Sequence, residues 1–288
     1  MRVTLLGAGV PTPTPDRFGS AYLLDVAEQS LLIDCGPATT YKLTRAGRRA
    51  PEISLLFFTH HHFDHNADYP CFVLTRWDQD TEQKPLRVYG PRPTAAFTRT
   101  LFDAPDGAYV PDWNARVEHP GSKRVFSNRG GARPRTRPQI DVSEIDATFV
   151  LEEAGFTVRA ADTVHAQPYL ESVAYRIESD DASIAFTGDT EPVASVVDLA
   201  RGADMFVCMC WDTDRAMNEE GVSRGMTGAG SAGQLAADAG VGTLVLTHIC
   251  PRLDAPEARE EAIREAKNVF GGPVVLGEEL MVLEVGHP

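Results

Sequence analysis

The sequence contains no long apolar segment, and no stretch approaches the ~18 consecutive apolar residues that a membrane-spanning helix needs. Cysteine is scarce: the 288 residues include five, with no C-x-x-C pair. This excludes a disulfide framework and indicates a reducing compartment. The apolar run at the start breaks at Gly7, which predicts a strand and a turn and not a secretory signal. We therefore expect a soluble, cytoplasmic protein with no membrane partner.

Basic residues are also in short supply. Lys and Arg number 27 against 41 Asp and Glu, which gives a formal net charge of −14. Phosphate contacts need clustered Lys and Arg, so this balance argues against a general polyanion binder and leaves room for a single basic patch. Apolar residues make up 43% of the chain, enough to fill a core, and the length suits one large domain or two small ones.

Short apolar runs between turn residues recur along the whole chain and predict strands. They are found at residues 2–6, 21–26, 30–34, 53–59, 86–90, 156–161, 172–178, 183–187, 205–210, 243–247, 274–276 and 281–285. Helical patterns occur at residues 38–46, 91–102, 193–201, 231–239 and 256–270. Strands mix with helices in both halves and no biased linker separates the halves. This pattern predicts two layered α/β halves in a single domain, 1–288.

One stretch differs from the rest. Residues 119–140 contain no acidic residue and six basic ones, which are Lys123, Arg124, Arg129, Arg133, Arg135 and Arg137. The Gly and Pro content predicts a loop, which forms part of a basic arm inserted at about 103–146. A loop this long in a compact domain is usually functional or disordered. Two interpretations are open: a solvated or subunit-contacting arm, and a positively charged lid over a site for an anionic substrate.

The strongest local signal is the sequence THHHFDH at residues 59–65, which holds four of the eight histidines and directly follows a predicted strand. In an extended segment residues i and i+2 share a face, so His60 and His62 can point to one centre. Asp64 and His65 begin the next turn and can face a second centre. Imidazole and carboxylate together suit Zn²⁺ and also Mn²⁺ or Fe. A chance match to H-x-H-x-D-H is rare, which disfavours a solvated polar loop.

Two metal ions need more ligands than this motif supplies. His165, Asp189 and His248 each stand just after a predicted strand. Open α/β sheets bind their ligands at the carboxyl ends of strands, so we expect these side chains to join the motif. Each has an ordinary alternative when taken alone, such as a helix N-cap role for Asp189. Their joint placement favours a metal site.

These motifs resemble those of the metallo-β-lactamase superfamily, and within it the ribonuclease Z and arylsulfatase-like branch. The resemblance covers most of the chain, in the stretches LLGAGVPTPTPDRFGSAYLL, LLIDCGPAT, THHHFDH, VHAQPYLESVAYRI, FTGDTEP and GMTGAGSAGQLAADAGVGTLVLTHICPR. It implies an α/β fold of the αββα sandwich type, with two mixed β-sheets face to face and helices outside. Homodimers are common in this branch, so a homodimer is compatible with the resemblance, and the arm could lie across a partner subunit.

The resemblance also implies a ligand set and a mechanism. The cofactors would be two divalent metal ions, with Zn²⁺ expected and Mn²⁺ or Fe as alternatives. The implied ligands are His60, His62 and His165 for one ion, Asp64, His65 and His248 for the other, and Asp189 as a bridge. A hydroxide bridging the two ions would attack an ester, and Asp64 would be catalytic because it orients or deprotonates this nucleophile.

The chain departs from ribonuclease Z at the residues that assist the leaving group there. Met209 stands in place of a Glu and Gly225 in place of a His, and neither side chain can transfer a proton. The interval between His165 and Asp189 is also too short for the arm with which the bacterial enzymes grip tRNA. We therefore expect a small-molecule substrate, anionic if the basic arm is a lid, and no nucleic-acid partner.

The main hypothesis is a hydrolase that cleaves a small ester, either a phosphodiester, a sulfate ester or a lactone. A tRNA 3′-end endonuclease is the disfavoured alternative. An iron-dependent oxidoreductase and a non-catalytic metal-bound scaffold on the same fold are two further alternatives. The intact set of seven ligands favours hydrolysis.

The residues that would contact the substrate are less clearly marked. Trp211, Asp212 and Arg215 follow a predicted strand, and Arg76 and Trp77 lie beyond the metal motif. Trp could stack on a flat substrate group and Arg could clamp an anion. Ordinary packing of Trp and solvation of Arg are the alternatives.

Overall fold

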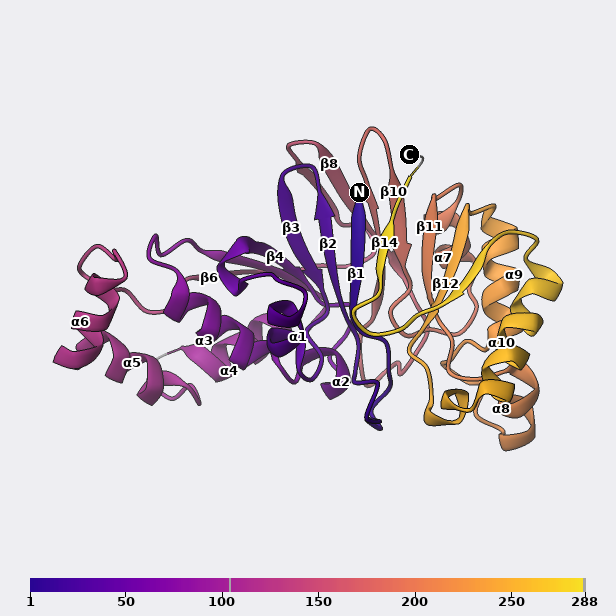
Figure 1. Cartoon of the computed structure of the whole chain (residues 1–288), viewed down its shortest axis with the longest axis horizontal. Helices are drawn as coiled ribbons and strands as arrows, with labels where there is room; N and C mark the ends of the chain where they lie inside the picture. Colours follow the sequence, from indigo (N-terminus) through magenta and orange to yellow (C-terminus); the bar gives the residue numbers. More distant parts are fainter. Residues whose placement is uncertain (104, 287–288) are drawn as a thin grey trace.

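The computed structural model describes residues 1–103 and 105–286. Two seven-stranded sheets lie face to face and helices cover both outer faces (Figure 1). Each sheet combines antiparallel and parallel pairs. The expected fold class, an αββα sandwich of two mixed sheets, is confirmed.

The first sheet has the order β14-β1-β2-β3-β4-β5-β6, antiparallel from β14 to β3 and parallel from β3 to β6. The elements of this part of the chain are β1 (Arg2–Gly7), β2 (Ala21–Val26), β3 (Gln29–Ile33), α1 (Thr39–Arg45), η1 (Ala50–Glu52), β4 (Ile53–Phe57), α2 (Phe63–Asn66), α3 (Tyr69–Gln79), β5 (Leu86–Gly90), α4 (Thr94–Phe102), α5 (Val110–Glu118), α6 (Pro120–Asn128) and β6 (Ile140–Glu144).

The second sheet has the order β13-β12-β11-β10-β9-β8-β7, parallel from β13 to β10 and antiparallel from β10 to β7. Its part of the chain consists of β7 (Val150–Glu153), β8 (Phe156–Asp162), β9 (Val173–Glu178), β10 (Ser183–Phe186), α7 (Ala194–Ala200), β11 (Met205–Met209), α8 (Asp214–Glu220), α9 (Ala229–Ala239), β12 (Thr243–Thr247), η2 (Pro251–Asp254), α10 (Pro256–Val269), β13 (Val274–Leu276) and β14 (Val282–Glu284). The last strand returns to the first sheet beside β1.

Strand β4 shows why the predicted strands are apolar along their whole length. Leu55 and Phe57 pack into the core between the two sheets, whereas Leu56 packs with the helices outside the first sheet. On the second sheet Val245 faces the inter-sheet core, and Leu246 packs with the helices of the other outer layer. Successive side chains point to opposite faces, so strands covered on both sides need apolar residues at nearly every position.

The loops that follow strands of the two sheets meet at one edge of the sandwich. The Val173 N–H donates to the Thr59 carbonyl at 2.9 Å, which joins the loop after β4 to the start of β9. The Ile249 N–H donates to the Ala8 carbonyl at 2.9 Å, which joins the loop after β12 to the loop after β1. Loops far apart in the sequence therefore lie side by side, and a site there can draw residues from both sheets.

The structure corrects the expectation for the basic arm. Residues 120–128 form helix α6 instead of a loop, and α5 precedes it. Pro120 occupies the first turn, and His119 Nδ1 caps the helix by accepting the Gly121 N–H at 3.2 Å. The arm also includes β6, which pairs with β5 in the first sheet. Gly and Pro at a helix start were thus mistaken for loop residues.

The described arm is not a lid over the histidine motif. Helices α5 and α6 lie at one end of the long axis of the molecule, whereas α2, which carries part of the motif, lies near the middle (Figure 1). Three of the arm's basic side chains, Arg116, Arg129 and Arg135, pair with Asp78 of α3. Its positive charge therefore serves, at least in part, to attach the arm to the first half.

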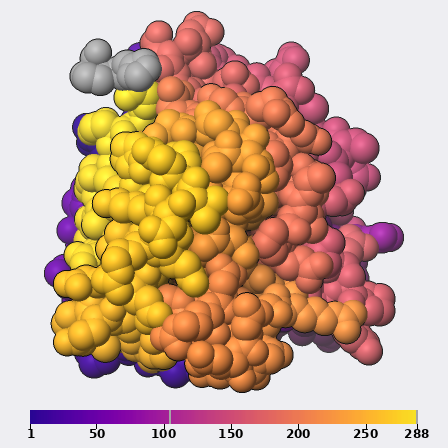
Figure 2. Space-filling view, turned by 90° about the vertical axis from the view of Figure 1, so that its right-hand side faces the viewer, coloured from indigo at the N-terminus to yellow at the C-terminus, as the bar shows by residue number. Residues whose placement is uncertain are grey.

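The opposite end of the molecule is formed by the C-terminal half. Figure 2 shows this face, on which orange and yellow atoms of the later elements cover most of the surface. In the part of the chain that the structure describes, no helix combines the length and the apolar character needed to cross a membrane.

Candidate metal centre

The THHHFDH motif lies between β4 and α3. His60 and His62 occupy the extended segment after β4, and His62 keeps an extended backbone with φ −69° and ψ 150°. The chain becomes helical at Phe63, so Asp64 and His65 lie in the short helix α2. This change of backbone conformation assigns the two pairs of side chains to different groups of candidate ligands.

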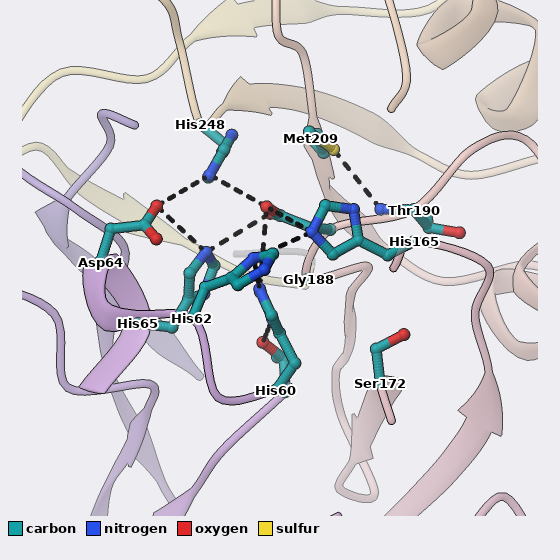
Figure 3. A network of polar contacts seen from close by, with 12 residues as sticks. His60, His62, Asp64, His65, His165, Ser172, Gly188, Thr190, Met209 and His248 are labelled. Atoms are coloured by element: carbon teal, nitrogen blue, oxygen red, sulfur yellow. Dashed lines mark hydrogen bonds and ion pairs between the residues drawn. The ribbon is translucent and has the colours of Figure 1, made fainter. Parts of the chain in front are cut away.

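The other candidate ligands follow strands of the second sheet. His165 comes after β8, Asp189 after β10 and His248 directly after β12. Labelled side chains of both sheets converge on one centre in Figure 3, namely His60, His62, Asp64, His65, His165 and His248. The structure thus brings together residues that lie up to 188 positions apart in the sequence.

One group consists of three histidines and a carboxylate, whose ligand atoms all lie within 4.8 Å of one another. His62 Nδ1 is 3.2 Å from His60 Nε2 and 3.1 Å from His165 Nε2. Asp189 Oδ2 is 3.9 Å from His60 Nε2 and 3.7 Å from His165 Nε2. Ring nitrogens that face one another around a carboxylate are the usual donors to a divalent cation.

The second group consists of Asp64, His65 and His248. Asp64 Oδ2 is 3.3 Å from His248 Nε2 and 3.6 Å from His65 Nε2. Asp189 also reaches this group, since its Oδ1 is 3.5 Å from His65 Nε2 and its Oδ2 is 3.1 Å from His248 Nε2. Asp189 is therefore placed between the two groups, where a carboxylate can contact both.

Burial keeps His60 and His62 in the form that binds metals. Desolvation lowers the pKa of His60 well below its ordinary value, and the charge of His65 adds to this effect. Desolvation and the charge of His165 lower the pKa of His62. An uncharged imidazole has a free nitrogen lone pair, which is the species that coordinates a cation.

The buried carboxylates of the cluster are stabilised by positive charge close to them. Burial alone would raise the pKa of Asp189, but His248 and His65 hold it well below its ordinary value. For His65, burial acts to lower the pKa, and the neighbouring Asp189 and Asp34 raise it well above the ordinary value. Buried anions thus draw a proton onto His65, and a divalent cation would satisfy the same carboxylates.

Unpartnered polar atoms show that the residues fit metal ions. Among the described residues, three buried side-chain atoms that belong to this cluster have no hydrogen-bond partner, namely Asp64 Oδ1, His65 Nε2 and Asp189 Oδ1. Buried polar atoms are normally paired, so such a concentration needs an explanation. Imidazole nitrogen and carboxylate oxygen are ligands of Zn²⁺, and the donor set fits two divalent ions.

Asp34 is a site residue that the sequence analysis missed. Its Oδ2 accepts the His65 Nδ1–H at 2.8 Å and the Thr59 hydroxyl at 2.8 Å, and its Oδ1 accepts the Thr59 N–H at 2.7 Å. The Thr59 hydroxyl in turn lies 3.0 Å from His60 Nδ1. Asp34 therefore orients a histidine of each group from behind. The available signal was an Asp at the end of a buried apolar strand.

Comparison with known proteins places this chain in a family. Residues 29–249 match a family model described as a beta-lactamase superfamily domain. A Ribonuclease Z of Mycobacterium bovis is 32% identical over the whole of this chain and 99% of that relative. The chain belongs to the metallo-β-lactamase superfamily. The resemblance inferred from the sequence motifs is confirmed.

Solved structures of this superfamily share the fold over nearly the full length. The metallo-beta-lactamase fold protein YhfI from Bacillus subtilis has a TM-score of 0.75 at 22% identity, with 98% of each chain covered. The short form of human tRNase Z has a TM-score of 0.70 at 22% identity, with both chains fully covered. At this level of identity the likeness concerns the αββα architecture.

The two departures from ribonuclease Z lie beside the metallo-β-lactamase centre. Met209 is buried, and its Sδ accepts the Thr190 N–H with an N···S distance of 3.4 Å (Figure 3). Thr190 directly follows Asp189 in the sequence. Gly225 places its carbonyl 2.7 Å from His165 Nδ1. Neither position presents a titratable side chain to the cluster.

The predicted substrate-contacting residues after β11 divide into two kinds. Trp211 is half-buried, and its ring centroid lies 6.1 Å from that of His248, which places it at the cluster. Asp212 is buried and paired with Arg252, whose Nε lies 2.6 Å from Asp212 Oδ2. Arg215 is exposed and pairs with carboxylates of α8 and α10. The side chains of Asp212 and Arg215 are therefore already paired with other groups of the protein.

Arg76 and Trp77 are not brought to the centre. The Arg76 guanidinium donates to the carbonyl of Ile53, at the opposite end of β4 from the histidine motif. The Trp77 indole N–H donates to the Thr136 carbonyl at 2.9 Å. Both belong to the buried face of α3, where they attach the helix and the arm to the first sheet. Only their proximity in sequence to the motif suggested a role in the site.

Proposed function

We propose that this member of the superfamily is a metal-dependent hydrolase that cleaves a small ester. The observation that carries the proposal is the convergence of seven His and Asp side chains from both sheets into two groups that share Asp189. His60, His62 and His165 would hold one divalent ion, and Asp64, His65 and His248 the other. Zn²⁺ is the expected ion, with Mn²⁺ or Fe as alternatives.

When bound, two divalent ions would supply an activated water near neutral pH and stabilise negative charge on the ester. The protein's part is to hold the ligands rigidly and to manage protons. Burial would raise the pKa of Asp64, but its hydrogen bond with His248 and the charge of His65 lower it. Asp64 is thus a carboxylate at neutral pH. Its Oδ2 faces His248, and the carboxylate would accept a proton from the attacking water.

The lack of a proton donor at positions 209 and 225 limits the substrate class. A leaving group that departs as a stable anion needs no general acid, whereas a simple alkoxide does. We therefore expect phosphodiesters, sulfate esters or lactones with good leaving groups. The half-buried Trp211 beside His248 offers a surface on which a flat substrate group could stack.

A ribonuclease is the second candidate function. The mycobacterial relatives named Ribonuclease Z match the entire chain at 32% identity, which favours an RNA substrate more than the sequence analysis allowed. Against it stand Met209, Gly225 and the net charge of −14. An RNA substrate therefore belongs in any test of function.

The test combines elemental analysis of the purified protein with turnover assays on bis(p-nitrophenyl) phosphate, p-nitrophenyl sulfate, a simple lactone and a precursor tRNA. About two zinc or manganese ions per chain, with turnover of a small ester, is the expected result. Cleavage of the precursor tRNA without small-ester turnover would select the ribonuclease. A single iron with redox activity, or bound metal without turnover, would select the oxidoreductase or the scaffold.

A further inference from the structure

The backbone of Gly225 orients the ring of His165. The Gly225 carbonyl accepts the His165 Nδ1–H at 2.7 Å. A carbonyl oxygen carries no proton, so this bond requires the proton on Nδ1 and leaves the lone pair on Nε2. That nitrogen faces His62 Nδ1 at 3.1 Å and Asp189 Oδ2 at 3.7 Å. The hydrogen bond therefore selects the tautomer that can bind a cation.

Glu191 holds Gly225 in this position. The Gly225 N–H donates to Glu191 Oε2 at 2.9 Å, and the Glu191 N–H donates to the Val164 carbonyl at 2.8 Å. One residue thus connects the backbone next to His165 with the glycine that orients the His165 ring. Thr190 adds a second connection, since its hydroxyl accepts the Val164 N–H at 3.1 Å.

No side chain fits at position 225 without moving His165. Gly225 has φ +74°, and a Cβ built on it would lie 2.3 Å from the His165 carbonyl oxygen. Real Cβ contacts are never this short, and the positive φ adds strain for any other residue. A proton-donating His at position 225 would therefore require the backbone of His165 to move.

We propose that Glu191 is a positioning residue for His165, acting through the backbone of Gly225, and that position 225 serves metal binding instead of proton transfer. The inference rests on the proposed function because it takes His165 as a metal ligand. The hydrogen bonds themselves belong to the metal-free chain, so they can be tested separately.

The first test reads the His165 tautomer in the metal-free protein by imidazole ¹⁵N–¹H correlation spectra. Wild type and Glu191→Gln should show the proton on Nδ1, because an amide oxygen can still accept the Gly225 N–H. Glu191→Ala should show a mixture of tautomers. The matched control is Glu171→Ala, which removes an exposed carboxylate that pairs with Arg92 and lies in the loop that carries His165. This variant should leave the spectrum unchanged.

The second test measures metal affinity by competition with a chromophoric chelator. Glu191→Ala should lose about 10- to 100-fold in affinity at one of two sites and keep the other, whereas Glu191→Gln should stay close to wild type. Gly225→His should also lose affinity at that site and gain no turnover. An unchanged tautomer and affinity in Glu191→Ala, or tight metal binding with faster turnover in Gly225→His, would overturn the inference. A wild type that binds no metal would instead refute the proposed function, and the tautomer test would still decide the role of Glu191.

Discussion

At the scale of residues, three histidines of the centre share one arrangement. His60, His65 and His165 each have Nδ1 in contact with an outer partner, which is a threonine hydroxyl, a carboxylate and a backbone carbonyl in turn. Their Nε2 atoms therefore face inward. His62 differs, because its Nδ1 faces the other histidines. In His60, His65 and His165 the outer partner thus determines which ring nitrogen is available, and substitution of these partners can test this role.

Removing the shared carboxylate should empty the centre. We expect Asp189→Ala to lose both ions and nearly all activity, because Asp189 lies between the two ligand groups. Metal content by mass spectrometry and ester turnover provide the measurement. The volume-conserving variant Met209→Leu is the control and should keep its metal. Loss of metal in Met209→Leu would show that position 209 takes part in metal binding and would contradict its placement outside the ligand set.

Asp34 should matter for metal affinity although it faces no metal-binding position directly. Asp34→Asn weakens the acceptor for His65 and Thr59, and we expect a loss of about 10- to 100-fold in affinity. Chelator competition measures this directly. Asp25→Asn is a matched control, since Asp25 pairs with Arg48 on a partly exposed surface. Equal affinities in both variants would contradict the orienting role of Asp34.

At the scale of elements, a buried cation, Arg135, helps to attach the arm to α3. The Arg135 guanidinium lies 3.9 Å from the ring centre of Trp77 and 4.9 Å from that of Phe126, and its Nη2 lies 3.1 Å from Asp78 Oδ1. This arrangement joins α6 to α3 through stacking and an ion pair. It also gives Arg135 a structural role that does not depend on a substrate.

Loss of this contact should loosen the arm and leave the metal centre intact. We expect Arg135→Ala to lower the free energy of unfolding by about 1–3 kcal/mol, since a stacked and paired buried cation is removed. Urea denaturation measures this change, and metal content should not alter. Arg133→Ala removes an exposed cation of the same segment and should cost less than about 0.5 kcal/mol. Similar losses in both variants would argue against the special role of Arg135.

At the scale of the whole molecule, the centre connects the two sheets. Four candidate ligands follow β4 in the first sheet, and three follow strands of the second. A cation held by both groups would resist separation of the sheets, because the unfolded chain does not present these ligands together. Metal binding and the stability of the sandwich should therefore be linked.

Metal removal should lower the melting temperature. Ligand present at about 100 times its Kd stabilises the native state by about 2.7 kcal/mol, which corresponds to a shift of roughly 5 °C for a chain of this size. Calorimetry with and without a chelator measures this shift. Asp189→Ala should melt at the same temperature in both conditions. A chelator effect that persists in this variant would place the stabilising ion elsewhere.

The predictable parts of the fold are those in which local pattern and tertiary environment agree. The run before the histidine motif was predicted as a strand because β4 is apolar on both faces. Helix α3 was missed although its buried residues follow a helical spacing, namely Tyr69, Phe72, Val73, Arg76 and Trp77. The spacing was not recognised as an apolar stripe because one of its five residues, Arg76, is charged. Helix α6 was missed because its Pro and Gly lie in the first turn, where a helix tolerates them.

The sequence by itself determined the chemistry of the candidate centre. The motif after β4 and the polar residues after later strands specify imidazole and carboxylate ligands, because residue type decides donor atoms and strand ends decide placement. The tertiary structure alone decided which partners hold those ligands. Asp34, Gly225 and Glu191 act through contacts between loops distant in sequence. Such contacts depend on how two sheets pack, and no local pattern of residues records that packing.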